Sequence, residues 1–242
     1  MTTRLTSASR LEDGEVHVWW TGETQRFIDL NVRLRADEQE RAGRFRAGDD
    51  RDRFAARRRL LRALLARYHG GQPDDIELLA TPFGKLHLAT VPATITFSMT
   101  SSGPTTVFAF TRHQPIGVDV ESYDRRLDER GLARMVCTPS ERAALAALDE
   151  GRRSRAFFTF WTHKEAVSKA DGRGLSLAPT EIDVAWTLDD RAGTTVVADG
   201  SSPGAVWHSC TLELADELSA AVATALRPQH VLCTELRPDE LF

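Results

Sequence analysis

The sequence has little cysteine and no long apolar run. Its 242 residues include three cysteines, Cys137, Cys210 and Cys233, which are widely spaced and form no CxxC pair. This excludes a disulfide framework and a cysteine zinc site, and it suits a reducing cytoplasm. No stretch approaches the ~18 apolar residues of a membrane span, and residues 1–15 lack the apolar region of a secretory signal. We therefore expect a cytoplasmic protein with no membrane partner.

Lysine is almost absent too. The 31 basic residues comprise 28 arginines and only three lysines, Lys85, Lys164 and Lys169. A lysine ammonium is compact and can give up a proton, whereas a guanidinium cannot. In a chain that otherwise uses arginine, the three lysines are candidates for positions where a small, titratable cation is needed.

Positive charge is concentrated in one segment of a mildly acidic chain. The formal net charge is −4, yet residues 41–67 contain ten arginines against three aspartates. Such a patch typically faces an anion, either a phosphate-bearing ligand or a nucleic acid. A solvated helix face with internal ion pairs is the alternative.

The pattern of apolar residues predicts an α+β fold with two halves of similar make-up, 1–113 and 114–242. Helices are expected over 37–46, 50–69, 153–170 and from the Thr138–Glu141 capping box to about Asp149. The expected strands are 14–21, 76–80, 86–88, 94–99, 105–110, 115–120, 181–186, 194–198, 205–213 and 218–226.

Two carboxylates lie two residues apart on one of these strands, in Gly117-Val118-Asp119-Val120-Glu121. Alternation along a strand directs Asp119 and Glu121 to the same face. Like charges on one face are unfavourable without a cation between them, and hard oxygen ligands suit Mg²⁺. An acidic edge strand with no ligand is the simpler alternative.

A stripe of side chains follows the long helix expected over 153–170. Phe157, Trp161, Glu165 and Lys169 are spaced by four and therefore share one face. Glu165 and Lys169 could form an ordinary surface ion pair. Two large aromatic residues on the same stripe argue against full exposure and favour a site at its polar end.

Two upstream turns complete the set. Thr81–Lys85 presents a lysine, and residues 97–103, FSMTSSG, are expected to run from a strand into a loop rich in hydroxyl groups. Such a loop offers N–H and hydroxyl donors to phosphate. A plain serine-rich turn is the alternative.

Together these residues resemble the Sfp-type 4′-phosphopantetheinyl transferases. The match comprises Gly117–Glu121, then Trp161-Thr162-His163-Lys164-Glu165-Ala166, Lys169 and Gly172–Leu175, and it is closest to the subgroup with Trp and Ala in that second motif. The arginine-rich helix, Gly84-Lys85 and the 97–103 segment follow in the family's order. The resemblance spans about residues 37–190. Leu86 stands where the family has proline, and Ser98 and Ser101 replace its asparagine and histidine.

The resemblance implies a pseudo-twofold pair of α+β halves, each a small antiparallel sheet packed on helices, with coenzyme A between them. It implies Mg²⁺, or Mn²⁺ in its place, held by Asp119, Glu121 and Glu165. The catalytic residues would be Glu165, Lys169 and Asp119. The residues expected to bind coenzyme A are Arg53, Arg58, Lys85, Ser101, Ser102, Lys164 and Lys169.

The implied reaction moves 4′-phosphopantetheine from coenzyme A to a serine of an apo acyl or peptidyl carrier protein and releases 3′,5′-ADP. The enzyme is expected to act as a monomer. Fatty-acid, polyketide and peptide-synthetase carriers all remain open as partners. From the residues alone, two alternatives stand: a Mg²⁺-dependent nucleotide phosphohydrolase, and a non-enzymatic nucleic-acid binder using the arginine-rich helix.

Overall fold

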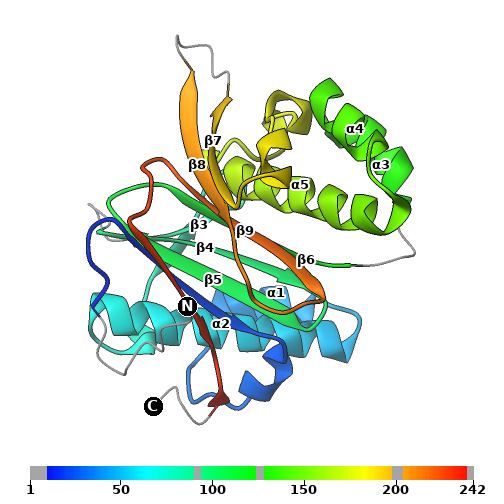
Figure 1. Ribbon diagram of the computed structural model, residues 1–242. Helices are drawn as coiled ribbons and strands as arrows, with labels where there is room; N and C mark the ends of the chain where they lie inside the picture. The colour runs from blue at the N-terminus through cyan, green and yellow to red at the C-terminus, as the bar shows by residue number, and fades with distance from the viewer. Residues whose placement is uncertain (1–9, 90–93, 124–127, 198–203, 239–242) are drawn as a thin grey trace.

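Two four-stranded sheets form the centre of the computed structural model, which describes residues 10–89, 94–123, 128–197 and 204–238 (Figure 1). In the first sheet, neighbouring strands are β10 (His230–Glu235), β1 (Glu15–Thr21), β5 (Thr105–Arg112) and β4 (Ile95–Ser102). In the second they are β6 (Ile116–Ser122), β9 (Leu218–Thr224), β8 (Ala205–Thr211) and β7 (Ala192–Val197). A separate ribbon consists of β2 (Leu78–Ala80) and β3 (Leu86–Leu88).

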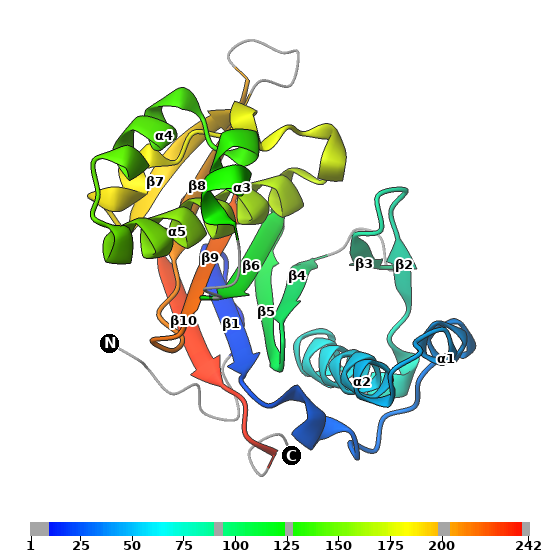
Figure 2. The same cartoon turned by 90° about the vertical axis from the view of Figure 1, so that its right-hand side faces the viewer.

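Helices cover each sheet on one side. Near the first sheet lie η1 (Thr24–Phe27), α1 (Ala36–Gly43), α2 (Gly48–His69) and η2 (Pro73–Asp75). Near the second lie α3 (Glu129–Val136), α4 (Pro139–Ala146), α5 (Glu150–Asp171), η3 (Gly174–Ser176), η4 (Pro179–Glu181) and η5 (Ala185–Leu188). Figure 2 shows α2 and α5 on opposite sides of the strands. The expected α+β class, with small antiparallel sheets packed on helices, is confirmed.

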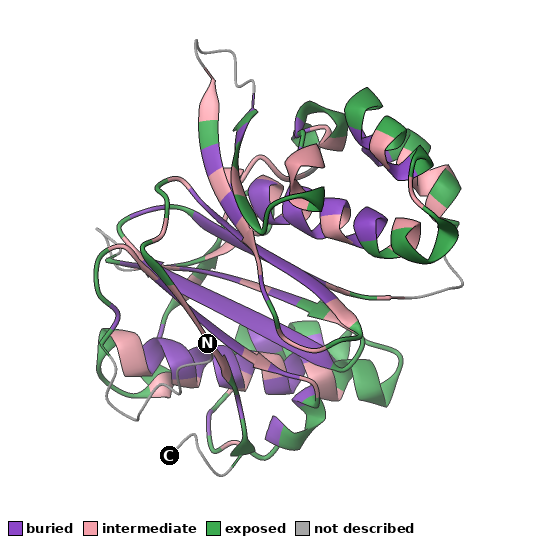
Figure 3. Cartoon of the chain, viewed as in Figure 1, coloured by how far each residue is buried: buried purple, intermediate pink, exposed green. Residues whose placement is uncertain are grey.

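The two sheets also pack on one another. Apolar side chains of β1 and β5 meet those of β6 and β9 in a common core, and Figure 3 shows these central strands as mostly buried. The core includes Val16, Val18, Val107, Val118, Val120 and Val222. Val118 and Val120 therefore face inward, as the alternation along this strand predicts. Their neighbours Asp119 and Glu121 point the other way.

The last strand departs from the proposed division at residue 113. β10 pairs in parallel with β1, so that His230 lies opposite Glu15 and Cys233 opposite Val18. All other neighbouring strands are antiparallel. The second half of the chain thus contributes an edge strand to the sheet of the first half. Whether the halves are related by a pseudo-twofold axis stays a prediction.

Several expected elements differ in the structure. Residues 181–186 do not form a strand, because the 3-10 turns η4 and η5 occupy 179–181 and 185–188. Two elements of the structure, α3 and β10, were not expected from the sequence. β4 continues to Ser102, so most of the expected 97–103 loop is strand, and only the Gly103–Pro104 turn separates it from β5.

Gly117 sets the distance between β6 and α5. A Cβ atom at this position would lie 2.0 Å from the backbone oxygen of Ala166 and 2.4 Å from the backbone nitrogen of Ala170. Only glycine permits so close an approach of strand to helix. The contact places the carboxylates of β6 beside the polar stripe of α5.

His163 faces away from that stripe and is fully buried. Its Nδ1 lies 2.9 Å from Ser209 Oγ and its Nε2 lies 3.0 Å from Thr211 Oγ1. The ring also meets the edge of Trp186. Burial lowers the pKa of His163 to about 3 from 6.5, so the imidazole is neutral in the folded protein.

We expect this histidine to make stability depend on pH. Below pH 6.5 the unfolded chain binds a proton at His163 that the folded chain does not bind until about pH 3. Stability is therefore lost as the pH falls between these values, by up to about 1.4 kcal/mol per pH unit. Denaturant unfolding at a series of pH values should show this slope in the wild type. In His163→Gln, the free energy of unfolding should depend less on pH, by the amount that corresponds to one proton. Equal slopes in the two proteins would contradict a neutral, buried His163.

Candidate active site

A cavity of about 700 Å³ lies between α2, the Pro82–Leu86 turn, β4 and α5. This size is typical of small-molecule sites. Of the residues expected to act on coenzyme A or in catalysis, six line it: Arg58, Lys85, Ser101, Lys164, Glu165 and Lys169. Four others do not line it: Arg53, Ser102, Asp119 and Glu121. Two arginines that were not singled out, Arg41 and Arg57, also line the cavity.

Asp119 lies buried at the joint between β6 and α5. Its Oδ1 accepts hydrogen bonds from Lys169 Nζ at 2.6 Å and Thr100 Oγ1 at 3.0 Å. Its Oδ2 is buried and has no hydrogen-bond partner among the described residues. Burial raises the pKa of Asp119, and Lys169 opposes that shift. A buried carboxylate oxygen without a donor is unfavourable, and a cation would satisfy it.

Glu121 and Glu165 belong to the same electrostatic group. Burial raises the pKa of each carboxyl, and the nearby charge of Asp119 raises both further. Three carboxylates that disfavour one another's ionisation fit a divalent cation bound among them. The described side chains nevertheless form no ready cluster of three metal-ligating groups. The metal assignment of Asp119, Glu121 and Glu165 therefore stays a prediction, supported by the unpaired Asp119 Oδ2.

Lys169 on α5 forms an ion pair with Asp119 on β6 and not with a residue of its own helix. Its Nζ contacts Asp119 Oδ1 and lies 3.3 Å from the oxygen of Val118, while the side chain remains 32 % exposed. No ion pair with Glu165 is found in the described structure, so the surface i,i+4 pair considered above does not describe it. Lys169 thus lines the cavity while its ammonium pairs with Asp119, which does not line it.

The other two lysines each have three acceptors, as Lys169 does with Asp119, Val118 and Thr100. Lys85 Nζ donates to the backbone oxygens of Lys169 at 2.5 Å and Ile116 at 3.1 Å, and burial lowers its pKa to about 8. It therefore ties the end of α5 to β6 at the edge of the cavity. This geometry leaves its expected role toward coenzyme A as a prediction.

Lys164 is the centre of a buried ion pair. Its Nζ lies 2.8 Å from Glu141 Oε2 and donates to the oxygens of Pro179, at 2.8 Å, and Ile182. All three N–H donors of the ammonium are thus used within the protein. Although Lys164 lines the cavity, the structure places no free donor there for coenzyme A, and the ion pair instead fixes the 179–182 segment of the cavity wall.

Three guanidinium groups of α1 and α2 line the cavity, those of Arg41, Arg57 and Arg58. Arg58 is 7 % exposed and stacks over Phe54, and its buried Nη1 has no hydrogen-bond partner within the described part of the chain. Burial lowers the pKa of Arg57 and of Arg58. An anion bound in the cavity would give Arg58 Nη1 an acceptor and would favour the charged forms of Arg57 and Arg58. Arg53 pairs with Asp50 at 2.6 Å and does not line the cavity.

The hydroxyl-rich segment divides its side chains between two directions. Ser101 faces the cavity and accepts a hydrogen bond from Arg57 Nη1 at 2.5 Å. Thr100 and Ser102 face β6, where they donate to Asp119 and to Glu121, respectively. Ser102 is thus engaged with a carboxylate and not with the cavity.

Besides Arg41, the sequence did not single out Arg57 or Thr100, which contact expected site residues. Arg57 reaches the position where the family has histidine, through its contact with Ser101. A strand period of two over residues 98–102 would have assigned Thr100 and Ser102 to one face and Ser101 to the other. Because these residues were expected to form a loop, the alternation of a strand was not applied to them.

Comparisons with known proteins identify the family of the chain. The model of the 4′-phosphopantetheinyl transferase superfamily matches residues 115–224. The chain is 31 % identical to the 4′-phosphopantetheinyl transferase HetI of Nostoc sp. over 87 % of its length and 88 % of that protein. It is 28 % identical to the 4′-phosphopantetheinyl transferase Sfp of Bacillus subtilis over 75 % of its length and 77 % of that protein. The chain belongs to the 4′-phosphopantetheinyl transferase family.

Proposed function

We propose that the protein transfers the 4′-phosphopantetheine group of coenzyme A to a serine hydroxyl of an apo acyl or peptidyl carrier protein. The observation that carries this proposal is the cavity itself, which has guanidinium groups on one wall and Glu165 and Lys169 on the other. Phosphate groups bound to the arginines would lie beside the carboxylates of β6 and α5. Family membership supplies the reaction class.

Asp119, Glu121 and Glu165 are the residues that would hold Mg²⁺, or Mn²⁺ in its place. When bound, the ion would neutralise charge on the pyrophosphate and polarise the phosphorus under attack. Arg57 and Arg58 would hold further phosphate oxygens by charge-assisted hydrogen bonds. Phosphoryl-type transfer needs mainly such positioning and charge neutralisation.

Glu165, which lines the cavity, would accept the proton of the attacking serine. Burial raises the pKa of its carboxyl in the metal-free protein, and a bound cation would oppose that shift. The serine oxygen forms a bond to the phosphorus that bears pantetheine, and the bond from that phosphorus to the bridging oxygen breaks. Lys169 Nζ would neutralise or protonate the 3′,5′-ADP that leaves.

The structure bears on the nucleic-acid alternative. Arg59 donates to the backbone oxygens of Ile28 and Val32, and Arg62 is buried against Glu38. Arg57 and Arg58 face the cavity. Several arginines of the basic segment are therefore used within the protein, which supports a small phosphate-bearing ligand.

The remaining attributes extend the proposal. We take the partner to be a carrier protein of fatty-acid, polyketide or peptide synthesis, and the enzyme to act as a monomer in the cytoplasm. None of the described helices has the length and apolarity needed to cross a bilayer. All three cysteines are free thiols.

Mass spectrometry of a panel of apo carrier proteins tests the function. Each carrier is incubated with the enzyme, coenzyme A and Mg²⁺, and we expect a gain of one phosphopantetheine on at least one of them. Chelation of divalent cations should stop the reaction. Breakdown of coenzyme A without any gain on a carrier would favour the phosphohydrolase alternative.

Arg58 should contribute to binding of the 3′-phosphate. Loss of a charge-assisted hydrogen bond costs about 1.5–3 kcal/mol, so Arg58→Ala should raise the KM for coenzyme A by about tenfold to a hundredfold. The KM for 3′-dephospho-coenzyme A should change less. Arg51→Ala is the matched control, because Arg51 lies exposed on the same helix beside Asp52. Equal loss for both substrates would make Arg58 structural.

A further inference from the structure

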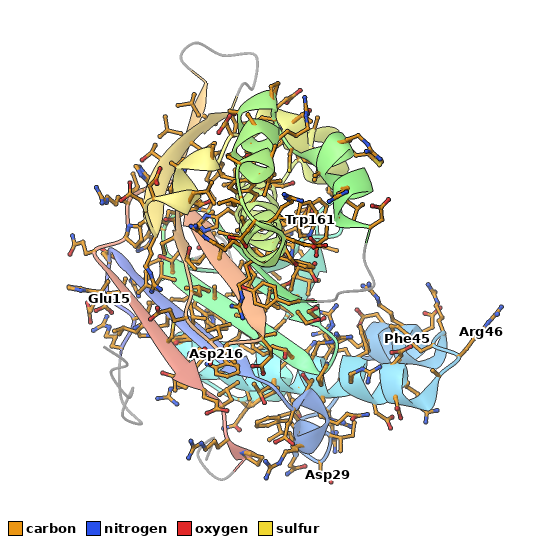
Figure 4. All side chains as sticks on the ribbon, turned by 45° about the vertical axis from the view of Figure 1, so that its right-hand side comes forward. Glu15, Asp29, Phe45, Arg46, Trp161 and Asp216 are labelled. Atoms are coloured by element: carbon orange, nitrogen blue, oxygen red, sulfur yellow. The ribbon has the colours of Figure 1, made fainter. Side chains whose placement is uncertain are left out.

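Glu121 is held by two hydrogen-bond donors that come from different halves of the chain. The indole Nε1–H of Trp161 on α5 donates to Glu121 Oε1 at 3.3 Å (Trp161 is labelled in Figure 4). The hydroxyl of Ser102 on β4 donates to Glu121 Oε2 at 3.1 Å. Each carboxylate oxygen therefore has one side-chain donor.

The Ser102 hydroxyl has further partners on β6. Its oxygen accepts the backbone N–H of Ser122 at 3.2 Å and lies 3.5 Å from Ser122 Oγ, so that Glu121 Oε2, at 3.1 Å, is the nearer acceptor for its proton. β4 and β6 lie at the edges of separate sheets. Side-chain hydroxyls span them here: Ser98 Oγ accepts Val118 N–H at 3.1 Å, and Thr100 donates to Asp119. Ser102 is the last of these three connections.

Trp161 is well suited to orient a carboxylate. Its ring packs against the core of the second half, and it has only two side-chain torsions. It also lies one turn before Glu165 on the same face of α5. One rigid helix therefore carries Glu165 and also the donor that orients Glu121.

Without these donors, repulsion from Asp119 would favour rotation of the Glu121 side chain toward solvent. Asp119 and Glu121 share one face of β6, and their like charges repel. Glu121 is half-buried near the open end of the strand, so that rotation toward solvent would separate the two charges. The hydrogen bonds oppose that rotation.

We propose that Trp161 and Ser102 are positioning residues that hold Glu121 beside Asp119 for the transfer reaction. The part of this inference that makes Glu121 a metal ligand rests on the proposed function. Neither residue lines the cavity. They act through the geometry of one carboxylate.

Trp161→Phe and Ser102→Ala test this role, because each removes one donor. Trp207→Phe is the matched control: Trp207 is a buried tryptophan whose Nε1 has no partner in the described part of the chain. The primary measurement is Mn²⁺ binding in the presence of coenzyme A, by calorimetry. Partners that orient a metal ligand typically matter by ten- to a hundredfold. We expect Kd for Mn²⁺ to rise at least tenfold in Trp161→Phe and in Ser102→Ala, but less than twofold in Trp207→Phe.

A cycle with Glu121→Ala separates positioning from a general structural effect. In that background Trp161→Phe should change the Kd for Mn²⁺ by less than twofold, because no carboxylate remains to be oriented. A loss of the same size in both backgrounds would overturn the proposal, as would a Kd within twofold of wild type in Trp161→Phe alone. Thermal unfolding of each variant measures the structural contribution separately.

The same variants distinguish this inference from the function. If the wild type modifies no carrier but Trp161→Phe still weakens Mn²⁺ binding, the positioning role stands and the proposed reaction fails. If the wild type modifies a carrier, Trp161→Phe should raise the Mg²⁺ concentration for half-maximal rate and leave the KM for the carrier unchanged. An unchanged Mg²⁺ requirement would count against the positioning role.

Discussion

Asp119→Asn is expected to reduce transfer by about a thousandfold while the protein stays folded. Asparagine keeps the size of the side chain and can still accept a hydrogen bond from Thr100, but it removes the charge. A loss of this size corresponds to about 4 kcal/mol of transition-state stabilisation, within the several kcal/mol expected when charge at a phosphoryl group is no longer neutralised. Initial rates at saturating Mg²⁺, with circular dichroism to check the fold, provide the measurement.

Asp183→Asn is a suitable control for this substitution. Asp183 accepts hydrogen bonds from Thr138 and Ser140, whose side chains lower its pKa against the effect of burial, and it does not line the cavity. The same change of carboxylate to amide should affect stability there and leave the rate within about twofold. Transfer by Asp119→Asn within tenfold of wild type, a loss below about 1.4 kcal/mol, would remove Asp119 from the catalytic residues.

Gly117→Ala is expected to damage both stability and activity, although it adds a single methyl group. The new Cβ would overlap the backbone of α5 at Ala166 and Ala170, and backbone atoms cannot rotate out of the way. β6 and α5 must therefore separate. Overpacking of this kind costs about 1–3 kcal/mol, and a displacement of about 1 Å can cost a hundredfold in rate. We expect losses at the upper end of both ranges.

Gly151→Ala provides the comparison, because Gly151 lies on α5, the helix against which Gly117 of β6 packs. Its nearest contact would be an ordinary 3.7 Å from Asp149, and alanine is the better helix former. This variant should be as stable as wild type or more so, with an unchanged rate. Melting temperatures and transfer rates of the two variants, measured side by side, decide the point. A Gly117→Ala protein that resembles wild type would show that the joint tolerates expansion.

Much of the centre of the site could be predicted from local sequence. Asp119, Glu121, Glu165 and Lys169 lie in two regular elements, and the strand and helix periods alone place each on the correct face. The structure then brings the strand and the helix together. What local periodicity could not show was the partner of Lys169, because the distance between β6 and α5 depends on the close approach at Gly117.

Residues whose role depends on distant partners were harder to predict. Lys164 was expected at coenzyme A, but its partner Glu141 belongs to the capping box of α4, and nothing in either motif indicates that the two meet. The 181–186 segment has the composition of a strand. In the structure, Lys164 Nζ donates hydrogen bonds to the backbone oxygens of Pro179 and Ile182. These bonds hold the segment in turns.

The pairing of β10 with β1 has a consequence for how the protein is made. During synthesis β1 emerges early and β10 is the last described strand to leave the ribosome, so the first sheet cannot be completed until nearly all the described chain has been translated. Until then β1 presents one open edge, from Glu15 to Trp20, to other chains. Pairing between segments so far apart also tends to be slow. Gene fragments that stop short of β10 would leave this edge of β1 open and should therefore yield aggregating protein.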